Sequence, residues 1–507
     1  MITQYLEALL SSQKTEYLLG DSTGTLTRQE TRRLIDSISL RVDELTATTD
    51  RQISIAIHLP RNNYYLASIF ATWNTGNFYT PLNVDWPEHH LNSILGKLKP
   101  DIVISMAATL NCTAQLINPC EILEPKEVTT SIKNRWFVKN QSPGLAYIIF
   151  TSGSTGDQKG VMISKKAFCS YVDWAKRNFA NLSECTKLLI NGEMTFDISL
   201  ADIAFSFSHD LEIHISPQPS NIFMHLKLIQ DRKIDSLYAV PSTLNHMFKW
   251  ANSRKDIDLT HIKQICSGGD LLTVDIIQML KCTSPAAAIY NMYGPTELTM
   301  NCLSIRVDDI LPQIISDNAV PTGIAFPHLD IRLIPIEVQM DGPSDEISGE
   351  LIVAGEQLME GYLNDSKTTA GSFMWNGHKK FYKTGDYFTR KDGIFYFNER
   401  TDHLVKVKGY RINLSDITNL ISKESFVEEV RVIAVEGQMG EHQLVAFVRC
   451  VISEVDLDPM ARLGLACQRA LPTYMIPSRF ILIDQFPYGD TGKHNLAQLK
   501  LIAKTTG

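Results

Sequence analysis

Short apolar runs alternate with amphipathic segments over the first two thirds of the chain. Apolar runs predict strands at residues 53–59, 101–105, 188–190, 236–240 and 262–266. Apolar residues at three- and four-residue spacing predict helices between these runs, among them residues 26–45, 88–98 and 166–180. Strands that alternate with helices in this way are typical of parallel or mixed sheets covered by helices.

The pattern changes twice in the last third of the chain. From about Leu329, shorter extended segments separated by Gly and Asp turns predict a small antiparallel β region, at residues 349–355, 381–388 and 394–397. A mixed stretch follows Asp402, with strands expected at residues 430–435, 444–448 and 480–483. About one hundred residues suffice for a separate lobe. We therefore expect an α/β protein with a large core, residues 1–401, and a small mobile α+β lobe, residues 402–507.

Composition excludes several classes of protein. With 507 residues, of which 44% are hydrophobic, the chain can bury substantial cores. A net charge of -8 and a pI near 5.9 argue against nucleic-acid binding. Nine scattered cysteines without paired spacing fit reduced thiols better than zinc ligands or disulfides. Without a signal peptide or an apolar run of membrane-spanning length, we expect a cytoplasmic protein that does not insert stably into membranes.

Residues 151–160 have the composition of a phosphate-binding loop. They read TSGSTGDQKG directly after the apolar residues 146–150, so a buried strand is expected to lead into a loop rich in glycines and hydroxyls. Gly153 and Gly156 allow backbone amides to converge on one point, and Lys159 supplies a cation. The glycine and lysine spacing differs from that of a Walker loop. A solvated Gly/Ser turn without a ligand is the alternative interpretation.

Seven further short segments follow this loop in order. They are FDIS at 196–199, NMYGPTE at 291–297, GEL at 349–351, YKTGD at 382–386, RTD at 400–402, KGYRI at 408–412 and GK at 492–493. The ordered set resembles the adenylate-forming superfamily, which includes nonribosomal peptide synthetase adenylation domains, acyl-CoA synthetases and luciferases. The resemblance spans nearly the whole chain. It implies an enzyme that joins a carboxylic acid to the α-phosphate of ATP with release of pyrophosphate.

The barrier to such a reaction is electrostatic. The acid is already ionised at neutral pH, so two anions must meet and pyrophosphate must leave. Cations, backbone amides and a divalent metal are needed where negative charge accumulates. The resemblance implies that the loop holds the β- and γ-phosphates of ATP, with Thr151 among the catalytic residues, and that Glu297 helps to coordinate Mg²⁺.

The resemblance also assigns the remaining nucleotide contacts. It implies that Tyr293 faces the adenine, that Asp386 and Arg400 hold the ribose hydroxyls, and that Lys493 bridges the substrate carboxylate and the α-phosphate. The expected ATP-binding residues are Thr151, Ser152, Gly153, Ser154, Thr155, Gly156, Lys159, Gly268, Gly269, Asn291, Tyr293, Gly294, Thr296, Asp386 and Arg400.

Each of these residues has a plainer interpretation when it is taken alone. Glu297 after Gly-Pro-Thr could interact with free amides at a helix start, Asp386 could be a turn residue and Lys493 a solvated loop cation. Tyr293 could be a half-buried strand aromatic. Only their order along the chain favours the functional interpretation.

A second half-reaction follows from a geometric conflict. If Lys493 occupies the site during adenylation, another nucleophile cannot reach the same acyl carbon until the small lobe moves. The resemblance makes Asp402 the hinge of that movement, with an ordinary surface Asp as the alternative. Residues 406–410 would then line the approach of a thiol, and the second product would be a thioester.

Asp197 is the residue that indicates most directly which carboxylic acid the enzyme activates. In amino-acid-activating relatives the Asp of this motif pairs with the substrate α-ammonium, whereas a carboxylate buried against a fatty tail would be costly. A helix N-cap formed with Ser199 is the alternative. The provisional substrate-binding residues are Asp197, Ile198, Thr243, Ser267, Met292, Met300 and Lys493, with Ala201, Ile265 and Asn301 beside them.

The size of the predicted pocket favours a small substrate. Asp followed by Ile resembles glycine-activating domains, and the bulky Ile198 and Met292 would leave little room beyond Cα. We therefore expect glycine first and D- or L-alanine next. If these two side chains point into the core, as is common for Ile and Met, this argument fails.

The chain extends only fourteen residues beyond Lys493. We therefore expect a stand-alone ligase that acts on a separate phosphopantetheinylated carrier protein, similar to D-alanine–carrier protein ligases or to the glycine ligases of lipid A modification. Gln158, Glu399, Asn413 and His494 depart from the family pattern without removing an assigned residue. An acyl- or aryl-CoA ligase and a non-catalytic nucleotide-binding relative are the alternative functions.

Overall fold

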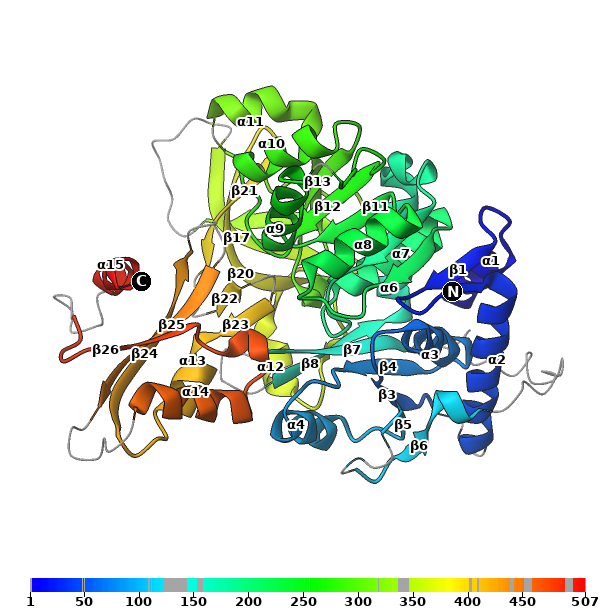
Figure 1. Cartoon of the computed structure of the whole chain (residues 1–507), viewed down its shortest axis with the longest axis horizontal. Coiled ribbons are helices and arrows are strands. Elements are labelled where there is room, and N and C mark those ends of the chain that lie inside the picture. The colour runs from blue at the N-terminus through cyan, green and yellow to red at the C-terminus, as the bar shows by residue number, and fades with distance from the viewer. Residues whose placement is uncertain are drawn as a thin grey trace. The chain divides into compact units, whose positions relative to one another are not determined.

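The computed structural model describes residues 2–47, 49, 51–107, 110, 112–122, 144–152, 158–254, 256–317, 319–335, 346–400, 404–407, 410–437, 442–450, 458–487 and 496–506. The chain divides into two compact units. Figure 1 shows the helices and strands of the whole chain. The first unit comprises Met1–Val84, Leu95–Phe150 and Gly160–Glu399. The second comprises Asp85–Ile94, Thr151–Lys159 and Arg400–Gly507. The predicted α/β class is confirmed, while the lobe boundary at residue 402 and its mobility stay predictions.

The described part of the first unit contains a nine-stranded sheet in the order β15-β14-β13-β12-β11-β9-β10-β1-β2. Its strands are β1 Tyr17–Gly20, β2 Thr25–Thr27, β9 Lys187–Ile190, β10 Glu212–Ile215, β11 Ser236–Ala239, β12 Gln264–Gly268, β13 Ala288–Tyr293, β14 Leu303–Arg306 and β15 Ile324–Ala325. The strands from β13 to β1 in this order run parallel. At the two edges, β2 pairs antiparallel with β1, β14 pairs antiparallel with β13, and β15 pairs antiparallel with β14. The crossovers are α7 Ile198–His209, α8 Ile222–Arg232, α9 Pro241–Asn252 and α10 Val274–Thr283.

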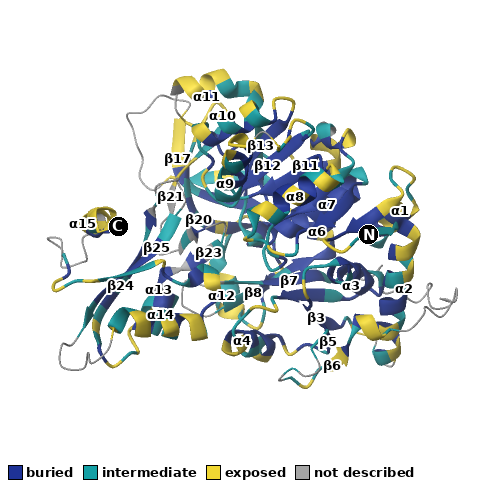
Figure 2. Ribbon diagram, viewed as in Figure 1, coloured by how far each residue is buried: buried dark blue, intermediate teal, exposed yellow. Residues whose placement is uncertain are grey.

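A second sheet has the order β18-β8-β7-β4-β3-β5-β6 among the described residues. Its strands are β3 Ser54–His58, β4 Phe78–Leu82, β5 Ile102–Ser105, β6 Gln115–Ile117, β7 Leu145–Ser152, β8 Gln158–Ser164 and β18 Gly361–Tyr362. The nearby helices in sequence are α1 Ile2–Ser11, α2 Arg28–Leu45, α3 Asn63–Asn74, α4 Glu88–Leu98 and α6 Lys165–Asn178. Figure 2 shows that the strands of both sheets are largely buried.

Local sequence explains where these elements begin. Thr27 and Glu30 form a capping box at the start of α2, in which the Glu30 carboxylate accepts a hydrogen bond of 2.8 Å from the Thr27 amide. Ser164 similarly caps α6. The predicted helix at 26–45 therefore begins at Arg28, because Thr27 takes the cap position.

The predicted antiparallel region is a separate sheet of the first unit. It has the order β16-β17-β20-β19, with β21 paired to β20, and its strands are β16 Asp330–Ile334, β17 Glu346–Ala354, β19 Phe373–Asn376, β20 Lys379–Lys391 and β21 Ile394–Arg400. The helices of this part are α11 Leu311–Asp317 and α12 Ser366–Ser372. Short 3-10 helices lie at Pro119–Glu121, Ala180–Ser183, Thr296–Leu298 and Asp308–Ile310.

The C-terminal part of the second unit has its own core of helices and strands. Its strands are β22 Leu404–Val407, β23 Tyr410–Asn413, β24 Val427–Glu436, β25 His442–Cys450 and β26 Arg479–Leu482. Its helices are α13 Leu414–Ile421, α14 Pro459–Ala470 and α15 Leu496–Thr505, with a 3-10 turn at Thr473–Met475. Within the described ranges, no helix is both long enough and apolar enough to cross a membrane.

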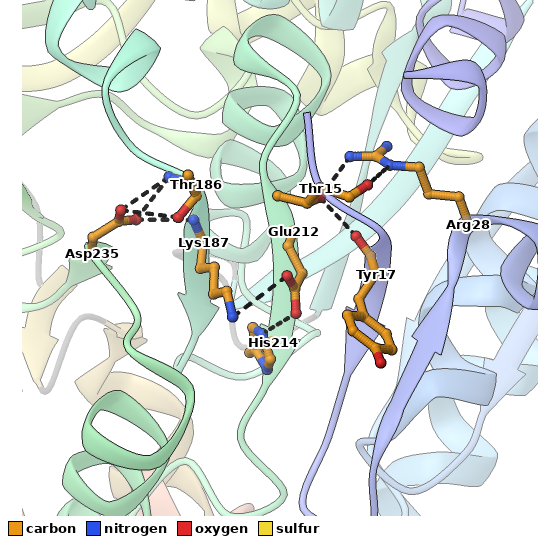
Figure 3. A network of polar contacts seen from close by, with 8 residues as sticks. All are labelled: Thr15, Tyr17, Arg28, Thr186, Lys187, Glu212, His214 and Asp235. Carbon is orange, nitrogen blue, oxygen red and sulfur yellow. Dashed lines mark hydrogen bonds and ion pairs between the residues drawn. The ribbon is translucent and has the colours of Figure 1, made fainter. Parts of the chain in front are cut away.

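A polar network fastens the amino ends of three neighbouring parallel strands (Figure 3). Asp235, just before β11, accepts hydrogen bonds from the amides of Thr186 and Lys187 at 3.0 and 2.9 Å. At the start of β10, a carboxylate oxygen of Glu212 lies 2.7 Å from His214 Nε2, and the other lies 3.7 Å from Lys187 Nζ. These contacts stabilise the sheet at the amino ends of its parallel strands. Open α/β sheets bind their ligands at the opposite, carboxyl ends of the strands.

Candidate functional site

The loops at the carboxyl ends of the parallel strands carry most of the candidate residues of the first unit. Asp197 follows β9 and precedes α7, Gly268 ends β12 and Tyr293 ends β13. Thr243 lies in the first turn of α9, directly after β11. The parallel pairing of β12 with β13 sets Ser267 beside Asn291 and Gly268 beside Met292.

Asp197 occupies the N-cap position of α7 without acting as a cap. Its backbone is already helical, with φ of -68° and ψ of -14°, and its side chain makes no capping hydrogen bond. The Ser199 hydroxyl instead donates to the Phe196 carbonyl at 2.8 Å. The side chain is only 5% exposed. The N-cap alternative for Asp197 and Ser199 therefore finds no support in the geometry.

Tyr147 is a neighbour of Asp197 that the motifs do not indicate. Burial, and secondarily the charge of Asp197, raises the pKa of the Tyr147 hydroxyl well above its ordinary value. That hydroxyl is buried and finds no hydrogen-bond partner among the described residues. Its position in β7, just before the phosphate loop in sequence, gave no signal of its own.

Apolar side chains of the predicted pocket are buried. Ile198 at the start of α7, Met292 in β13 and Met300 are each at most 5% exposed and belong to one apolar cluster. Gly268 has no space for a side chain, because an added Cβ would lie 2.7 Å from the Met292 carbonyl oxygen and 2.4 Å from the Tyr238 hydroxyl. Ala201 and Ile265 are also buried, and Thr243 is half-buried.

Asn301 is held between two tyrosines that sequence reasoning missed. Tyr171 of α6 donates a hydrogen bond of 2.9 Å to the Asn301 amide oxygen, and the Asn301 amide nitrogen donates to the Tyr238 hydroxyl at 3.0 Å. Asn191 in turn donates to the Tyr238 carbonyl at 2.8 Å. The side chain of Asn301 is thereby oriented by residues from α6 and β11, which lie far from it in sequence.

The expected adenine and ribose residues of the first unit meet directly. The Tyr293 hydroxyl donates a hydrogen bond of 2.5 Å to Asp386 Oδ2, and the Tyr293 ring packs edge-on against Phe388 at 4.9 Å between centroids. Asn291 donates to the Pro321 carbonyl at 2.8 Å. Asp386 lies in the middle of β20, so the plainer interpretation as a turn residue is not what its location indicates.

Glu297 lies in the 3-10 turn Thr296–Leu298 and is only 1% exposed. Its carboxylate accepts a hydrogen bond of 2.8 Å from the Tyr362 hydroxyl, and its backbone carbonyl accepts one of 2.9 Å from the Met359 amide. A buried carboxylate fits the oxygen ligands that Mg²⁺ prefers. Within the described residues, no group of three or more His, Cys, Asp and Glu side chains is placed to hold a metal ion.

Several expected residues lie outside the described part of the chain. They are Gly153, Ser154, Thr155, Gly156, Asp402 and Lys493. Ser152 and Arg400 lie in β7 and β21, but nothing is described of their side chains. Thr151 is half-buried near the end of β7, and Lys159 lies in β8.

A histidine lies beside the end of the phosphate loop within the second unit. Gln158 Nε2 lies 2.9 Å from His90 Nε2, and burial, with a smaller contribution from His89, lowers the pKa of His90 to about 4. The imidazole is therefore neutral at pH 7 and can accept the amide hydrogen. Gln158 stands where the family usually has Pro, and this contact explains what the glutamine side chain does.

Comparisons with known proteins agree with this arrangement. The family model described as AMP-binding enzyme matches residues 10–363. The chain is 28% identical to gramicidin S synthase 2 of Brevibacillus brevis over 87% of its own length, although it spans only 10% of that protein. It is also 28% identical to a D-alanine–D-alanyl carrier protein ligase of Listeria monocytogenes, over 88% of each chain.

Solved structures share the same fold. The adenylation domain AlmE of Vibrio cholerae, in complex with glycyl-adenosine-5'-phosphate, superposes with a TM-score of 0.83 at 21% identity, covering 99% of this chain and 97% of that one. The order of the motifs, the α/β fold and the match over more than half of the chain agree with one another. The chain therefore belongs to the AMP-binding enzymes of the adenylate-forming superfamily.

Proposed function

We propose that the protein activates a small amino acid, with glycine favoured over D- or L-alanine, and passes it to a separate carrier protein. The observation that carries this proposal is Asp197, a buried carboxylate at the start of α7 that serves no capping role. A carboxylate in such a place can form a charge-assisted hydrogen bond with a substrate α-ammonium. A fatty or aryl acid offers no such group and would place its apolar chain against a buried carboxylate.

The preference for a small substrate rests on Ile198 and Met292 bounding the space beyond the substrate Cα in addition to packing in the core. Ile198 directly follows Asp197, and Met292 and Met300 are buried in the same apolar cluster. A pocket bounded by side chains of this size would accept hydrogen or methyl beyond Cα and reject larger groups. Glycine and alanine satisfy both conditions.

The two half-reactions assign tasks to residues of this chain. In the first, a substrate carboxylate oxygen bonds to the α-phosphorus of ATP as the bond to pyrophosphate breaks. The loop at residues 151–160 would bind the phosphates, Glu297 would hold Mg²⁺, and Tyr293 and Asp386 would hold the nucleoside. When bound, Mg²⁺ neutralises charge on the phosphate oxygens. Lys493 would contact the developing charge between carboxylate and phosphate.

In the second half-reaction, the phosphopantetheine thiolate of a carrier protein would attack the acyl carbon and AMP would leave. The proposal includes a lobe rotation about Asp402 that brings residues 406–410 to the thiol. The relative in Listeria monocytogenes is itself a ligase for a carrier protein and is similar over most of both chains, which supports a carrier as the acceptor. We place the reaction in the cytoplasm, with lipid A as a candidate for the later acceptor.

ATP–pyrophosphate exchange with all proteinogenic amino acids, D-alanine, acetate and benzoate tests the proposal. We expect the fastest exchange with glycine, near loss of exchange in Lys493→Ala, and in Asp197→Ala a loss of amino-acid use with ATP·Mg²⁺ binding retained. Fastest exchange with acetate or benzoate would instead indicate a CoA ligase. Nucleotide binding without exchange for any acid would indicate a non-catalytic relative.

A further inference from the structure

Residues 357–363 follow β17 and include β18. They touch three parts of the proposed site, and we call them the bridging segment. On one side they pair with β8, the strand that follows the phosphate loop in sequence. The Glu360 amide donates to the Met162 carbonyl at 2.9 Å, and the Leu363 amide donates to the Gly160 carbonyl at 2.8 Å. The bridging segment is thereby attached to the strand that leaves the loop.

The bridging segment also holds the residue expected to bind Mg²⁺. The Tyr362 hydroxyl donates to the Glu297 carboxylate at 2.8 Å, and the Met359 amide donates to the Glu297 carbonyl at 2.9 Å. One contact orients the carboxylate and the other fixes the backbone that carries it. The bridging segment therefore holds both the carboxylate and the backbone of Glu297.

Gln357 contacts the turn that follows Glu297. Its amide nitrogen lies 2.8 Å from the Asn301 carbonyl oxygen, 3.0 Å from that of Leu298 and 3.4 Å from that of Thr299. The Thr299 hydroxyl returns a hydrogen bond of 2.7 Å to the Gln357 carbonyl. The other end of the Gln357 amide, its oxygen, lies 2.6 Å from His328 Nε2. Gln357 is fully buried, so water does not substitute for these contacts.

The turn itself has a backbone that needs such support. Thr299 and Met300 have φ of 57° and 75°, in the left-handed region that residues other than glycine rarely adopt. Non-glycine residues persist there only when their surroundings hold them. Because Met300 and Asn301 belong to the proposed amino-acid pocket, the group that holds this turn also sets one wall of that pocket.

We propose that the bridging segment couples nucleotide, metal and amino-acid binding, with Gln357 and Tyr362 as positioning residues. This inference rests on the proposed function, because the coupling needs both ligands. A displacement of β8 by bound phosphates would move the bridging segment, and with it both Glu297 and the Met300 turn. ATP·Mg²⁺ should then tighten amino-acid binding, and the amino acid should tighten ATP·Mg²⁺ binding by the same factor.

Amide hydrogen exchange of the full-length protein without ligands tests the mechanical part. Gln357→Glu keeps the size of the side chain and an oxygen toward His328 but removes the amide donors. We expect exchange in residues 297–302 to be at least about tenfold faster than in the wild type, because the donors that oppose local opening are gone. Ser284→Ala is the matched control, since it deletes one buried hydrogen bond of 2.7 Å to the Leu259 carbonyl outside the bridging segment. Unchanged exchange in Gln357→Glu would overturn the proposal.

The coupling is measured as the ratio of amino-acid dissociation constants without and with Mg²⁺ and a non-hydrolysable ATP analogue. We expect a ratio of about 5 to 150 in the wild type and in Ser284→Ala, within the usual range of coupling between sites, and a ratio near 1 in Gln357→Glu. A wild-type ratio retained in Gln357→Glu would overturn the proposal.

Two further variants separate the possible failures. Thr299→Val removes the 2.7 Å hydrogen bond to the Gln357 backbone carbonyl with little change of shape. If Gln357→Glu does not fold, amide hydrogen exchange and the ratio of dissociation constants are measured on Thr299→Val instead. Tyr362→Phe should raise the Mg²⁺ concentration needed for half-maximal activity about tenfold, the effect of one lost hydrogen bond to a charged group. Another outcome is that no acid supports ATP–pyrophosphate exchange while Gln357→Glu still speeds amide hydrogen exchange in residues 297–302. In that case the proposed function fails and the mechanical link stands.

Discussion

The Tyr293 hydroxyl donates a hydrogen bond of 2.5 Å to the carboxylate of Asp386. One residue ends a strand of the nine-stranded sheet, and the other lies in the antiparallel sheet 93 positions later in the chain. The two motifs expected to bind adenine and ribose are thus parts of one contact. If Asp386 binds the ribose as proposed, its buried carboxylate is already oriented by Tyr293 and would need little reorganisation on binding.

Tyr293→Phe removes this hydrogen bond and leaves the ring in place. Because a hydrogen bond to a charged group contributes about 1.5–3 kcal/mol, we expect the KM for ATP to rise about tenfold or more. The KM for the amino acid should change much less. Steady-state pyrophosphate exchange measures both constants. An unchanged KM for ATP would show that the oriented carboxylate does not contact the nucleotide.

Met292→Ala tests which way the predicted pocket faces. If Met292 bounds the space beyond the substrate Cα, its truncation should raise the preference for alanine over glycine about tenfold, as expected for room to fit one methyl group. Exchange rates with the two amino acids give the ratio. A loss of about 2–5 kcal/mol of stability with no change in that ratio would mean that Met292 serves only the core.

Gly294→Ala tests the close approach of two chain segments at the site. An added Cβ would lie 2.5 Å from Asn301 Cα and 2.6 Å from the Met300 carbonyl oxygen, so backbone must move. We expect a loss of about 1–3 kcal/mol of stability by thermal unfolding, and a larger loss of exchange than the unfolded fraction accounts for.

Gly464→Ala is the matched control for that substitution. Gly464 lies inside α14, and an added Cβ there meets no atom within 4 Å. Alanine in a helix interior should raise stability by about 0.5–1 kcal/mol, and activity should stay unchanged. Activity of Gly294→Ala at the wild-type level would show that the Met300 turn can shift without consequence for the site.

Acid should destabilise the first unit partly through His225. Burial lowers the pKa of His225 to about 4, below the ordinary value of 6.5. Between these two values the unfolded chain binds a proton that the folded chain does not, so stability falls as pH falls from about 6.5 to 4, by up to about 1.4 kcal/mol per pH unit. His225→Leu should flatten this slope in urea unfolding measured across that range. An equally steep slope in the variant would assign the acid sensitivity to other groups.

Much of the fold follows from local sequence. The apolar run at 236–240 and the amphipathic run at 88–98 match β11 and α4 closely. A strand buried throughout favours a continuous apolar run, whereas a helix buried on one face repeats its apolar residues every three or four positions. The capping box of Thr27 and Glu30 likewise uses residues three apart. The change to short extended segments after Leu329 predicts the antiparallel sheet for the same reason.

The sequence by itself determined the order of the motifs, the alternation of elements and which residues are candidates to bind phosphate, metal and ammonium, since these depend on side-chain chemistry and short-range spacing. Only the tertiary structure decided which of them meet. Asp197 makes no capping bond, Tyr362 orients Glu297 across 65 positions, and Gln357 supports the Met300 turn. Such contacts depend on how distant strands pair and pack, and no local period in a sequence records that pairing.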